Sequence, residues 1–358
     1  MKKRRQTGGS AKTATAKTTA KRAARRDAKA SSAGSGNALS VNRLAALLVR
    51  DMVRHAQALR VQVHRLKNGT QVIDAGIACV GGLEAGRRIT EICMGGLGRV
   101  NIRSAKVFSR WLWHVDVWSS NPIIACLASQ YAGWSLNHGE GREGFNALGS
   151  GPARALGSRE ELFRELNYRD RSSDAVMVIE VDRIPPMELA QQIAERCGVP
   201  ARNLTLILTP TSSLAGAVQV VGRVLEVAMH KLHAIGFPLE AVVDGSATAP
   251  LCPPAPDFLN AMGRTNDAII FGGQVHLFVN GPEEQARELA LKLPSAGSRD
   301  FGRPFCEVFK DYKYDFYQVD PMLFSPARAI VTSLASGRTF HSGSLHESLL
   351  DRSFGIAS

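Results

Sequence analysis

An arginine and a glutamate three residues apart form the most chemically suggestive pair in this sequence of 358 residues. They lie in Arg223-Val-Leu-Glu226, where apolar residues recur with helical spacing, so both side chains are predicted to share one face of a helix. A carboxylate beside a guanidinium stays ionised and can orient or deprotonate a water molecule. The same spacing is typical of an exposed intrahelical ion pair, which contributes only about 0.3–0.5 kcal/mol to stability. Spacing alone leaves both interpretations open.

A second segment, Leu148-Gly-Ser-Gly-Pro-Ala-Arg-Ala-Leu156, has the composition of a loop that leads into a helix. Glycine lets a ligand approach the backbone closely, and N–H groups at a helix start can bind the oxygens of a polar ligand. The predicted ligand contacts in this segment are Gly149, Ser150, Gly151 and Arg154. The alternative is a tight turn whose glycines serve geometry alone. Because the segment lacks Gly-x-Ser-x-Gly, the dinucleotide fingerprint and the Walker pattern, it indicates neither serine hydrolysis nor nucleotide binding.

The cysteines and histidines form no metal-binding pattern. The six cysteines are scattered without a Cys-x-x-Cys motif or a Cys/His cluster, so we expect small core residues in a reducing compartment and no metal. The N-terminal positive charge is not followed by an apolar segment, and no apolar run approaches the roughly 20 residues of a membrane span. These features predict a cytoplasmic protein without a membrane segment.

The net charge of +12 is concentrated at the N-terminus. Residues 1–38 contain eleven Lys/Arg and one acidic residue, whereas the remaining 320 residues carry a net charge of only +2. The segment has no aromatic residue and no apolar periodicity, so it is predicted to be a disordered tail. Weak contact with a polyanion through phosphate neutralisation is one interpretation of it, and a solubilising extension or a misplaced start codon is the other.

Beyond the tail, helical and strand patterns alternate irregularly, which predicts an α+β fold. Ser40 or Asn42 is expected to cap the first helix, and Asn68-Gly69 predicts a β-hairpin. The predicted helices cover about 81–98, 186–197, 215–234 and 283–292, and the predicted strands cover 111–118, 175–181, 204–208, 240–243, 267–271 and 274–279.

Several short motifs, in this order, resemble those of the methenyltetrahydromethanopterin cyclohydrolase family. They are Ser40-Val-Asn42, Val72-Ile-Asp-Ala-Gly76, Glu91-Ile-Cys-Met-Gly-Gly-Leu-Gly98, Pro122-Ile-Ile-Ala-Cys126, Ala128-Ser-Gln-Tyr-Ala-Gly-Trp134, the segment 148–156, Tyr314-Asp-Phe-Tyr317 and Asp320-Pro-Met-Leu-Phe-Ser-Pro326. The likeness covers the chain from about Leu39 onward, and the basic tail is a departure from the family.

The resemblance implies a fold of two lobes with related architecture and the active site in the cleft between them. Approximate lobes are 39–172 and 173–358, which can exchange segments, and the expected assembly is a homotrimer. Family members interconvert 5,10-methenyl- and 5-formyl-tetrahydropterin by adding water across a cyclic amidinium, and they need neither a metal nor a redox cofactor. This places the expected function in the one-carbon metabolism of a tetrahydromethanopterin carrier.

The resemblance also implies roles for particular residues. Arg223 and Glu226 match the family's catalytic pair, so Glu226 is expected to take the proton of the attacking water while Arg223 orients it. Gln130, Tyr131 and Trp134 are expected to form a wall for the pterin together with the segment 148–156, although core packing would use the same residues. The alternative function is a nucleic-acid-binding protein with a basic arm, but the nearly neutral charge of residues 39–358 offers no extended basic stripe.

Overall fold

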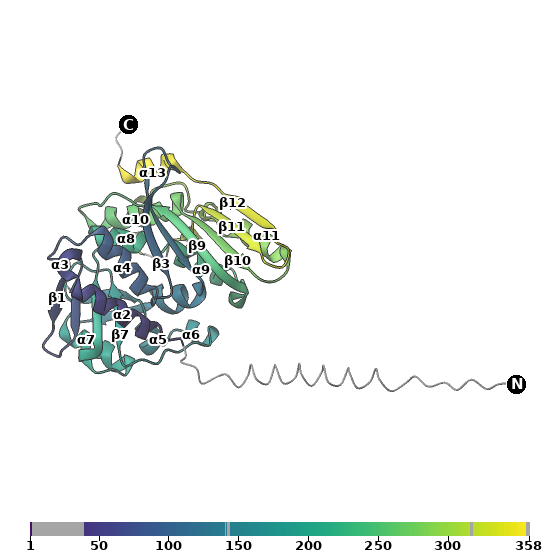
Figure 1. Ribbon diagram of the computed structural model, residues 1–358. Helices are drawn as coiled ribbons and strands as arrows, with labels where there is room; N and C mark the ends of the chain where they lie inside the picture. The colour runs from purple at the N-terminus through teal and green to yellow at the C-terminus, as the bar shows by residue number, and fades with distance from the viewer. Residues whose placement is uncertain (2–38, 140, 142–143, 316–317, 356–358) are drawn as a thin grey trace. The chain divides into compact units, whose positions relative to one another are not determined.

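The chain has two separate units, and the fold described here belongs to the second, Ser40–Ser358, which we call the body. The computed structural model describes residues 1, 39–139, 141, 144–315 and 318–355. The tail predicted at residues 1–38 lies outside the described residues except for Met1. The predicted α+β class is confirmed, because the body combines helices with two mixed β-sheets (Figure 1).

Each sheet contains six strands within the described ranges. The first sheet has the order β1-β2-β8-β7-β6-β5, formed by Gln62–Arg65, Gln71–Asp74, Leu204–Leu208, Ala175–Ile179, Phe145–Ser150 and Trp134–His138. The second has the order β12-β11-β10-β9-β4-β3, formed by Thr339–Gly343, Arg328–Ser333, Gln274–Val279, Val242–Pro250, Trp113–Ser119 and Arg99–Ser104. Each sheet takes strands from both sides of residue 172, so a single cut there would divide both sheets.

Helices lie between and around the strands. The α-helices are α2 (Val41–Arg54), α3 (Ala56–Leu59), α4 (Leu83–Cys93), α5 (Arg154–Gly157), α6 (Leu162–Glu165), α7 (Met187–Cys197), α8 (Leu214–Val221), α9 (Val224–Ala234), α10 (Phe258–Gly272), α11 (Glu283–Lys292), α12 (Phe305–Asp311) and α13 (Glu347–Phe354). A π-helix, η1, covers Ile124–Gln130, and short 3₁₀ turns are η3 (Ala201–Asn203), η4 (Leu239–Ala241), η5 (Ser295–Gly297) and η7 (Pro321–Leu323).

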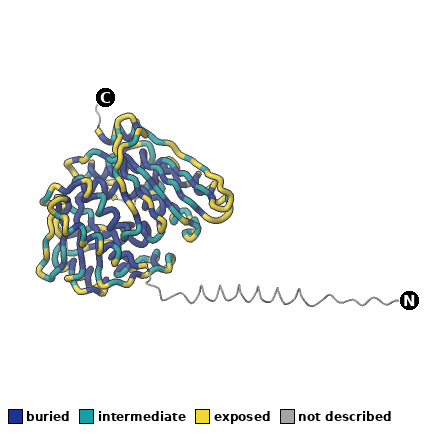
Figure 2. The backbone as a smooth tube through the Cα atoms, viewed as in Figure 1, coloured by how far each residue is buried: buried dark blue, intermediate teal, exposed yellow. Residues whose placement is uncertain are grey.

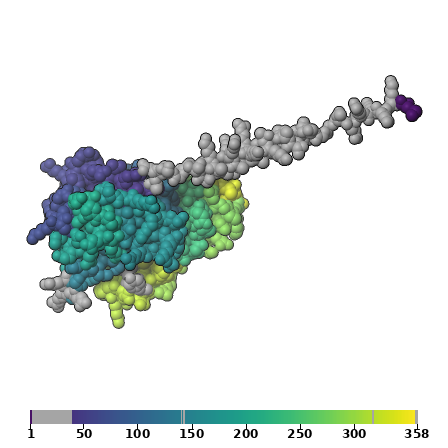
Figure 3. All heavy atoms as spheres, turned by 90° about the horizontal axis from the view of Figure 1, so that it is seen from below, coloured from purple at the N-terminus to yellow at the C-terminus, as the bar shows by residue number. Residues whose placement is uncertain are grey.

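The first sheet is buried on both faces. Strand β7 shows this directly, because Val176 and Val178 join the core beneath α2 and α4, whereas Met177 and Ile179 join the core beneath α7. Alternate residues of a strand point to opposite faces, so an unbroken apolar run suits a strand covered on both sides. Figure 3 shows the purple-blue surface of the early elements against the teal surface of residues near 200, as the pairing of β2 with β8 requires.

Helix α8 contributes to both halves of the core. Ala215 packs in the cluster of the first sheet, while Ala217 and Val218 pack in the large cluster of the second sheet. The helix contacts α4 on one side and α10 on the other. Dark blue, buried segments accordingly run through the middle of the body in Figure 2. The polar residues that follow α8, Arg223 and Glu226, are therefore buried between these two parts of the core.

The single helix predicted for 215–234 is wrong, because the structure has two helices, α8 and α9. Gly222 and Arg223 separate them, and the Arg223 N–H bonds to the carbonyl of Val220 rather than one residue further back. A Cβ at Gly222 would lie 2.6 Å from Cγ2 of Thr90 on α4. Close packing against α4 thus requires glycine at this break, and periodicity along the sequence cannot report it.

Other elements differ from the predicted ones for a related reason. The strand predicted at 267–271 is wrong, since these residues form the last turns of α10 and are buried on all sides. A short apolar run fits a buried strand and a buried helix equally well. Two other predicted boundaries differ from the structure. Strand β7 ends at Ile179 rather than at residue 181, and Gly149 and Ser150, predicted to lie in a loop, are the last residues of β6. The cap at Ser40 and the hairpin at Asn68-Gly69 are confirmed.

Replacing Asn42 by alanine is expected to lower the free energy of unfolding by about 2–4 kcal/mol, because buried polar groups lose their partners. The fully buried side chain donates to the carbonyl of Pro152 at 2.7 Å and to Asp170 at 2.8 Å, and it accepts from the N–H of Val176 at 3.0 Å. Urea unfolding measures this change. The control is Ser40→Ala, which removes only the cap of the same helix and should cost about 1 kcal/mol. Equal, small losses in both variants would contradict the prediction.

Candidate active site

Arg223 is a buried guanidinium with partners from several distant segments. It lies at the break between α8 and α9, where it is the N-cap of α9. Nη1 donates to the carbonyl of Gln130 at 2.7 Å, and Nη2 donates to the hydroxyl of Ser150 at 2.9 Å. Ser150 itself donates to the carbonyl of Val178 at 3.0 Å. These bonds fix the plane of the guanidinium relative to the first sheet.

Glu226 lies in the first turn of α9 and is only 4% exposed. Its Oε2 is 3.8 Å from Nη1 of Arg223, so the two residues form a loose ion pair. Burial raises the pKa of Glu226 to about 7, although the charges of Arg223 and Arg154 lower it. The position near the N-terminus of α9 also favours the negative charge. The exposed ion pair that the spacing allowed is therefore wrong, because both side chains are buried.

Glu180 is a functional candidate that the sequence patterns do not indicate. Its Oε1 lies 2.9 Å from Nη2 of Arg223, so it is closer to the guanidinium than Glu226 is. The sequence pattern included it in a strand through residue 181, whereas β7 ends at Ile179 and Glu180 is the first residue beyond it. An acidic residue at the carboxyl end of an apolar parallel strand was the available signal, because ligand sites gather at such ends.

Several polar atoms around Arg223 have no hydrogen-bond partner in the part of the chain that the structure describes. They are Oε1 of Gln130, Oε1 of Gln219 and Nε of Arg223, and all three are buried. The Gln130 amide donates to the carbonyl of Gly222 at 3.3 Å, which orients its free oxygen. Buried polar atoms usually pair with protein or ordered water, so these atoms mark where a polar ligand or water would be held.

Arg154 contacts the end of η1, the helix that carries Gln130. It is fully buried, and its guanidinium pairs with Glu160 and donates to the carbonyls of Leu127 and Ser129 at 3.0 and 3.2 Å. It also lies 5.0 Å from the centre of the Tyr131 ring. The helix predicted to start there, α5, has only four residues. Direct ligand contact by Arg154 stays a prediction, and the structure gives it a supporting position.

The structure brings Gln130, Tyr131 and Ser150 together near the pair. Gln130 ends the π-helix η1, and π-helices frequently occur at functional sites. The Tyr131 ring stacks on His230 with ring centres 4.9 Å apart, and His230 is one helical turn beyond Glu226. Gly151, with φ of +93°, turns the chain after β6 and donates its N–H to the carbonyl of Ser129 at 2.8 Å.

Trp134 lies on the other face of the first sheet. It pairs with Gly149, which pairs with Ile179, so these three positions face the core beneath α7. Ser150, which binds Arg223, faces the opposite side. Trp134 stacks under the guanidinium of Arg196 at 4.5 Å and lines a hollow of about 180 Å³. The structure therefore does not bring Trp134 to Arg223 and Glu226.

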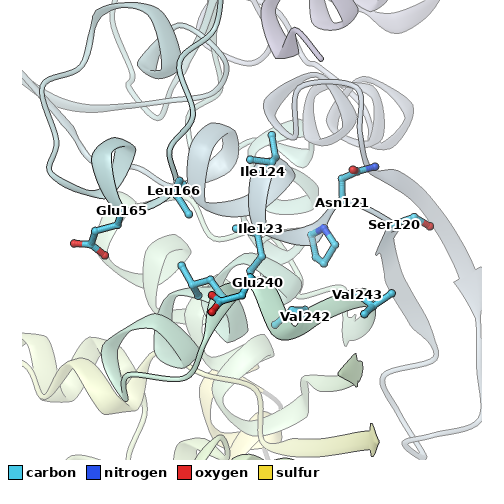
Figure 4. Close-up of a pocket in the computed structure, with 11 residues that line it drawn as sticks. Ser120, Asn121, Ile123, Ile124, Glu165, Leu166, Glu240, Val242 and Val243 are labelled. Carbon is cyan, nitrogen blue, oxygen red and sulfur yellow. The ribbon is translucent and has the colours of Figure 1, made fainter. Parts of the chain in front are cut away.

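A larger groove of about 310 Å³ adjoins the start of η1. Glu165 and Glu240 lie toward one end of it, and Ser120 and Asn121 lie toward the other (Figure 4). Its lining, drawn from the described residues, includes none of the predicted site residues. Helix η1 nevertheless connects the two regions, since Ile124 lines the groove and Gln130 binds Arg223.

Neither a metal cluster nor a membrane-spanning helix is found in the described ranges. No three side chains among His, Cys, Asp and Glu there are grouped as metal ligands. No helix there has the length and apolar character needed to cross a membrane.

Comparison with known proteins decides the family. The model of the family described as Cyclohydrolase (MCH) matches residues 40–354. This chain belongs to the cyclohydrolase (MCH) family. Relatives named methenyltetrahydromethanopterin cyclohydrolase include one from Methylobacillus flagellatus, 58% identical over 318 residues, covering 89% of this chain and 96% of the relative. Others come from Xanthobacter autotrophicus, 55% identical, covering 88% and 93%, and from Methanospirillum hungatei JF-1, 39% identical, covering 88% and 99%.

Membership of the cyclohydrolase family confirms the resemblance that the motifs indicated. The match begins at residue 40, so the tail precedes it and the buried pair lies within it. The nucleic-acid-binding alternative is not favoured, because the family match spans nearly the whole body. The chain is therefore an enzyme, and the buried cluster around Arg223 is its candidate active site.

Proposed function

We propose that this protein catalyses the reversible hydrolysis of 5,10-methenyl-tetrahydromethanopterin to 5-formyl-tetrahydromethanopterin. Glu226 handles the proton of the attacking water, and Arg223 orients Glu226. The observation that carries the proposal is the buried carboxylate of Glu226, with a pKa near 7, beside a guanidinium held in place by distant segments. The names of the relatives supply the substrate.

The charge of the substrate suits this carboxylate. The methenyl carbon bridges two nitrogens in a delocalised cation, which a nearby carboxylate stabilises. As the water oxygen bonds to that carbon, Glu226 takes one proton and the adduct becomes neutral. The bond to the nitrogen at position 10 then breaks, and Glu226 returns its proton to that nitrogen. As the formyl carbonyl forms, the remaining hydroxyl proton passes to the ionised Glu226, which later loses it to solvent, so hydrolysis ends with Glu226 protonated and releases one proton overall.

A pKa near 7 suits a reaction that runs in both directions. Hydrolysis needs Glu226 ionised, whereas cyclisation needs it protonated, and both forms are populated at neutral pH. A carboxylate in water, with a pKa near 4.3, would be a weaker base at the attacking step. Burial of Glu226 therefore contributes directly to the proposed chemistry.

The substrate is proposed to lie against the segment that joins η1 to β5 and against the end of β6. Tyr131 offers an aromatic ring on the side of Glu226, and Gln130 offers an unpaired amide oxygen. In this segment Ser150 reaches the pair through its bond to Arg223, and Gly151 turns the chain beside Ser129, whereas Gly149 faces the core beneath α7. Flat heterocycles with amide edges are commonly bound by aromatic stacking together with a few polar groups.

Further proposals follow from the family. We propose that the reaction needs neither a metal nor a redox cofactor, that the enzyme is a cytoplasmic homotrimer, and that it serves one-carbon metabolism. Activity that survives exhaustive treatment with chelator supports the first proposal, and sedimentation gives the mass of the assembly.

The direct experiment adds the purified full-length protein to methenyl-tetrahydromethanopterin and follows the absorbance of the methenyl chromophore. A loss of that absorbance proportional to protein concentration supports the proposed function. An unchanged absorbance with folded protein would contradict it. Deletion of residues 1–38 should leave the rate unchanged, because the family match begins at residue 40.

The rate of hydrolysis is expected to fall below about pH 7. Protonation of Glu226 removes the base, so kcat/KM should drop about tenfold for each pH unit below its pKa of about 7. Initial rates between pH 5 and 9 measure this, with circular dichroism as the control for folding. A flat profile down to about pH 5 would assign the base to a group with an ordinary carboxyl pKa.

A further inference from the structure

Two carboxylates compete for the single guanidinium of Arg223. Nη2 lies 2.9 Å from Oε1 of Glu180, while Nη1 lies 3.8 Å from Oε2 of Glu226. The tight ion pair is thus with Glu180, although Glu226 lies only three residues from Arg223, on the helix that Arg223 caps. Because Nη1 also donates to the carbonyl of Gln130 and Nη2 to Ser150, the guanidinium cannot turn toward Glu226 without losing these bonds.

The position of Glu180 is fixed by elements other than the one that carries Glu226. The amide of Gln219 on α8 donates to Oε1 of Glu180 at 3.0 Å and lies 3.5 Å from the hydroxyl of Thr209. Glu180 follows β7 and Thr209 follows β8, and these neighbouring strands are parallel. The side chain of Glu180 is 31% exposed, whereas that of Glu226 is 6% exposed. Glu180 therefore carries its negative charge at a smaller cost of desolvation.

We propose that Glu180 is a positioning residue that holds the Arg223 guanidinium away from Glu226, so that the Glu226 carboxylate remains free to exchange protons with water. This inference rests on the proposed function for its catalytic meaning. The geometry on which it stands, one guanidinium shared unequally between two carboxylates, does not depend on that function.

The electrostatic surroundings of Glu226 agree with this arrangement. Burial raises the pKa of Glu226, Arg223 and Arg154 lower it, and Glu180 raises it. The other titratable groups facing it are the buried thiols of Cys93 and Cys126, together with His230 one turn further along α9. Burial raises the pKa of both thiols and lowers the pKa of His230, so these three groups are neutral near pH 7. The charged groups that set the pKa of Glu226 are therefore Arg223, Arg154 and Glu180.

Loss of Glu180 is expected to lower the pKa of Glu226 for two reasons. A negative charge near Glu226 disappears, and the positive charge of Arg223 is no longer shared with a second carboxylate. Both changes favour the ionised form and lower the pKa of Glu226. A carboxylate with a lower pKa is a weaker base, so the rate at high pH falls while the decline at low pH begins later.

The test is Glu180→Gln, which keeps the size of the side chain and an acceptor for Gln219. We expect the acidic decline of kcat/KM to move to lower pH by about one unit and the rate at high pH to fall about 3–10-fold. The matched control is Glu188→Gln, which removes an exposed carboxylate on α7 and should change neither quantity. A lower rate with an unmoved pH profile would overturn the proposal, since a merely structural role gives that result.

A second readout does not require activity. Glutamate labelled with ¹³C at the carboxyl allows the titration of Glu226 to be followed by NMR, with Glu226→Gln to assign its signal. A lower Glu226 pKa in Glu180→Gln supports the positioning role even if wild-type protein does not hydrolyse the methenyl substrate, which would count against the proposed function alone. An unchanged Glu226 pKa would overturn the positioning role whatever the activity. Glu180→Asp keeps the charge and shortens the side chain, so it should give a smaller shift in the same direction.

Discussion

Replacing Glu226 by glutamine is expected to reduce the hydrolysis of methenyl-tetrahydromethanopterin about 10²–10⁴-fold, the range typical of losing a general base. The amide keeps the shape of the side chain but cannot accept the proton of the attacking water. The loss should fall on kcat, because Glu226 acts on the proton that moves in the transition state. Steady-state rates from the methenyl absorbance measure this effect.

The stability of the same variant provides an internal control with a defined sign. The folded-state pKa of Glu226, about 7, lies above the unfolded value, so wild-type protein loses stability as the pH rises from about 4.3 to 7. Glu226→Gln lacks this loss and should be more stable than wild type above pH 7, by about 4 kcal/mol at most. Urea unfolding at pH 5 and 8 tests it. Wild-type turnover in the variant would refute the role of Glu226.

Arg223→Met should nearly abolish hydrolysis at neutral pH, with a loss of about 10²–10³-fold that higher pH partly restores. Without the guanidinium, the principal charge that lowers the pKa of Glu226 is gone, so Glu226 stays protonated to a higher pH. The acidic decline of kcat/KM therefore moves to higher pH, opposite in direction to the change expected for Glu180→Gln. Rates measured between pH 6 and 9.5 distinguish the two directions.

Arg223→Met is also expected to lower the free energy of unfolding by about 3–5 kcal/mol, because removing one partner strands the other buried charge and polar acceptors. The groups that lose a partner are Glu180, the hydroxyl of Ser150 and the carbonyl of Gln130, whereas Glu226 takes up a proton instead of remaining charged. Arg223→Lys is the control, since it keeps the charge but not the fork of donors, and it should restore the pH profile more than the stability. A pH profile unchanged in Arg223→Met would contradict the electrostatic role.

Local sequence signals correctly predicted what local physics controls. Ser40 caps α2, and Asn68-Gly69 forms the hairpin between β1 and β2, because each depends on residues within a few positions. Apolar runs were harder to interpret, since 267–271 is the end of a helix that is buried on every side. Periodicity identifies an element only when one of its faces meets solvent.

Local sequence signals cannot predict the long-range partners of Arg223. Ser150 is 73 residues away and Gln130 is 93 residues away, and only the order of strands and the path of η1 bring them together. Pairing across β5, β6 and β7 sends Trp134 to the opposite face from Ser150, although both belong to motifs that suggested one wall. A shift of one residue along a strand decides which face a side chain occupies.

The α+β class, the family resemblance and the nearness of Arg223 to Glu226 follow from the sequence, because motif order and a three-residue spacing are properties of the chain alone. The tertiary structure alone decided that this pair is buried, that the helix breaks at Gly222, and that Glu180 is the closer partner of Arg223. The physical reason is that the acidity of a carboxyl group depends on how much solvent and which charges surround it, and residues from separate strands and helices supply those surroundings.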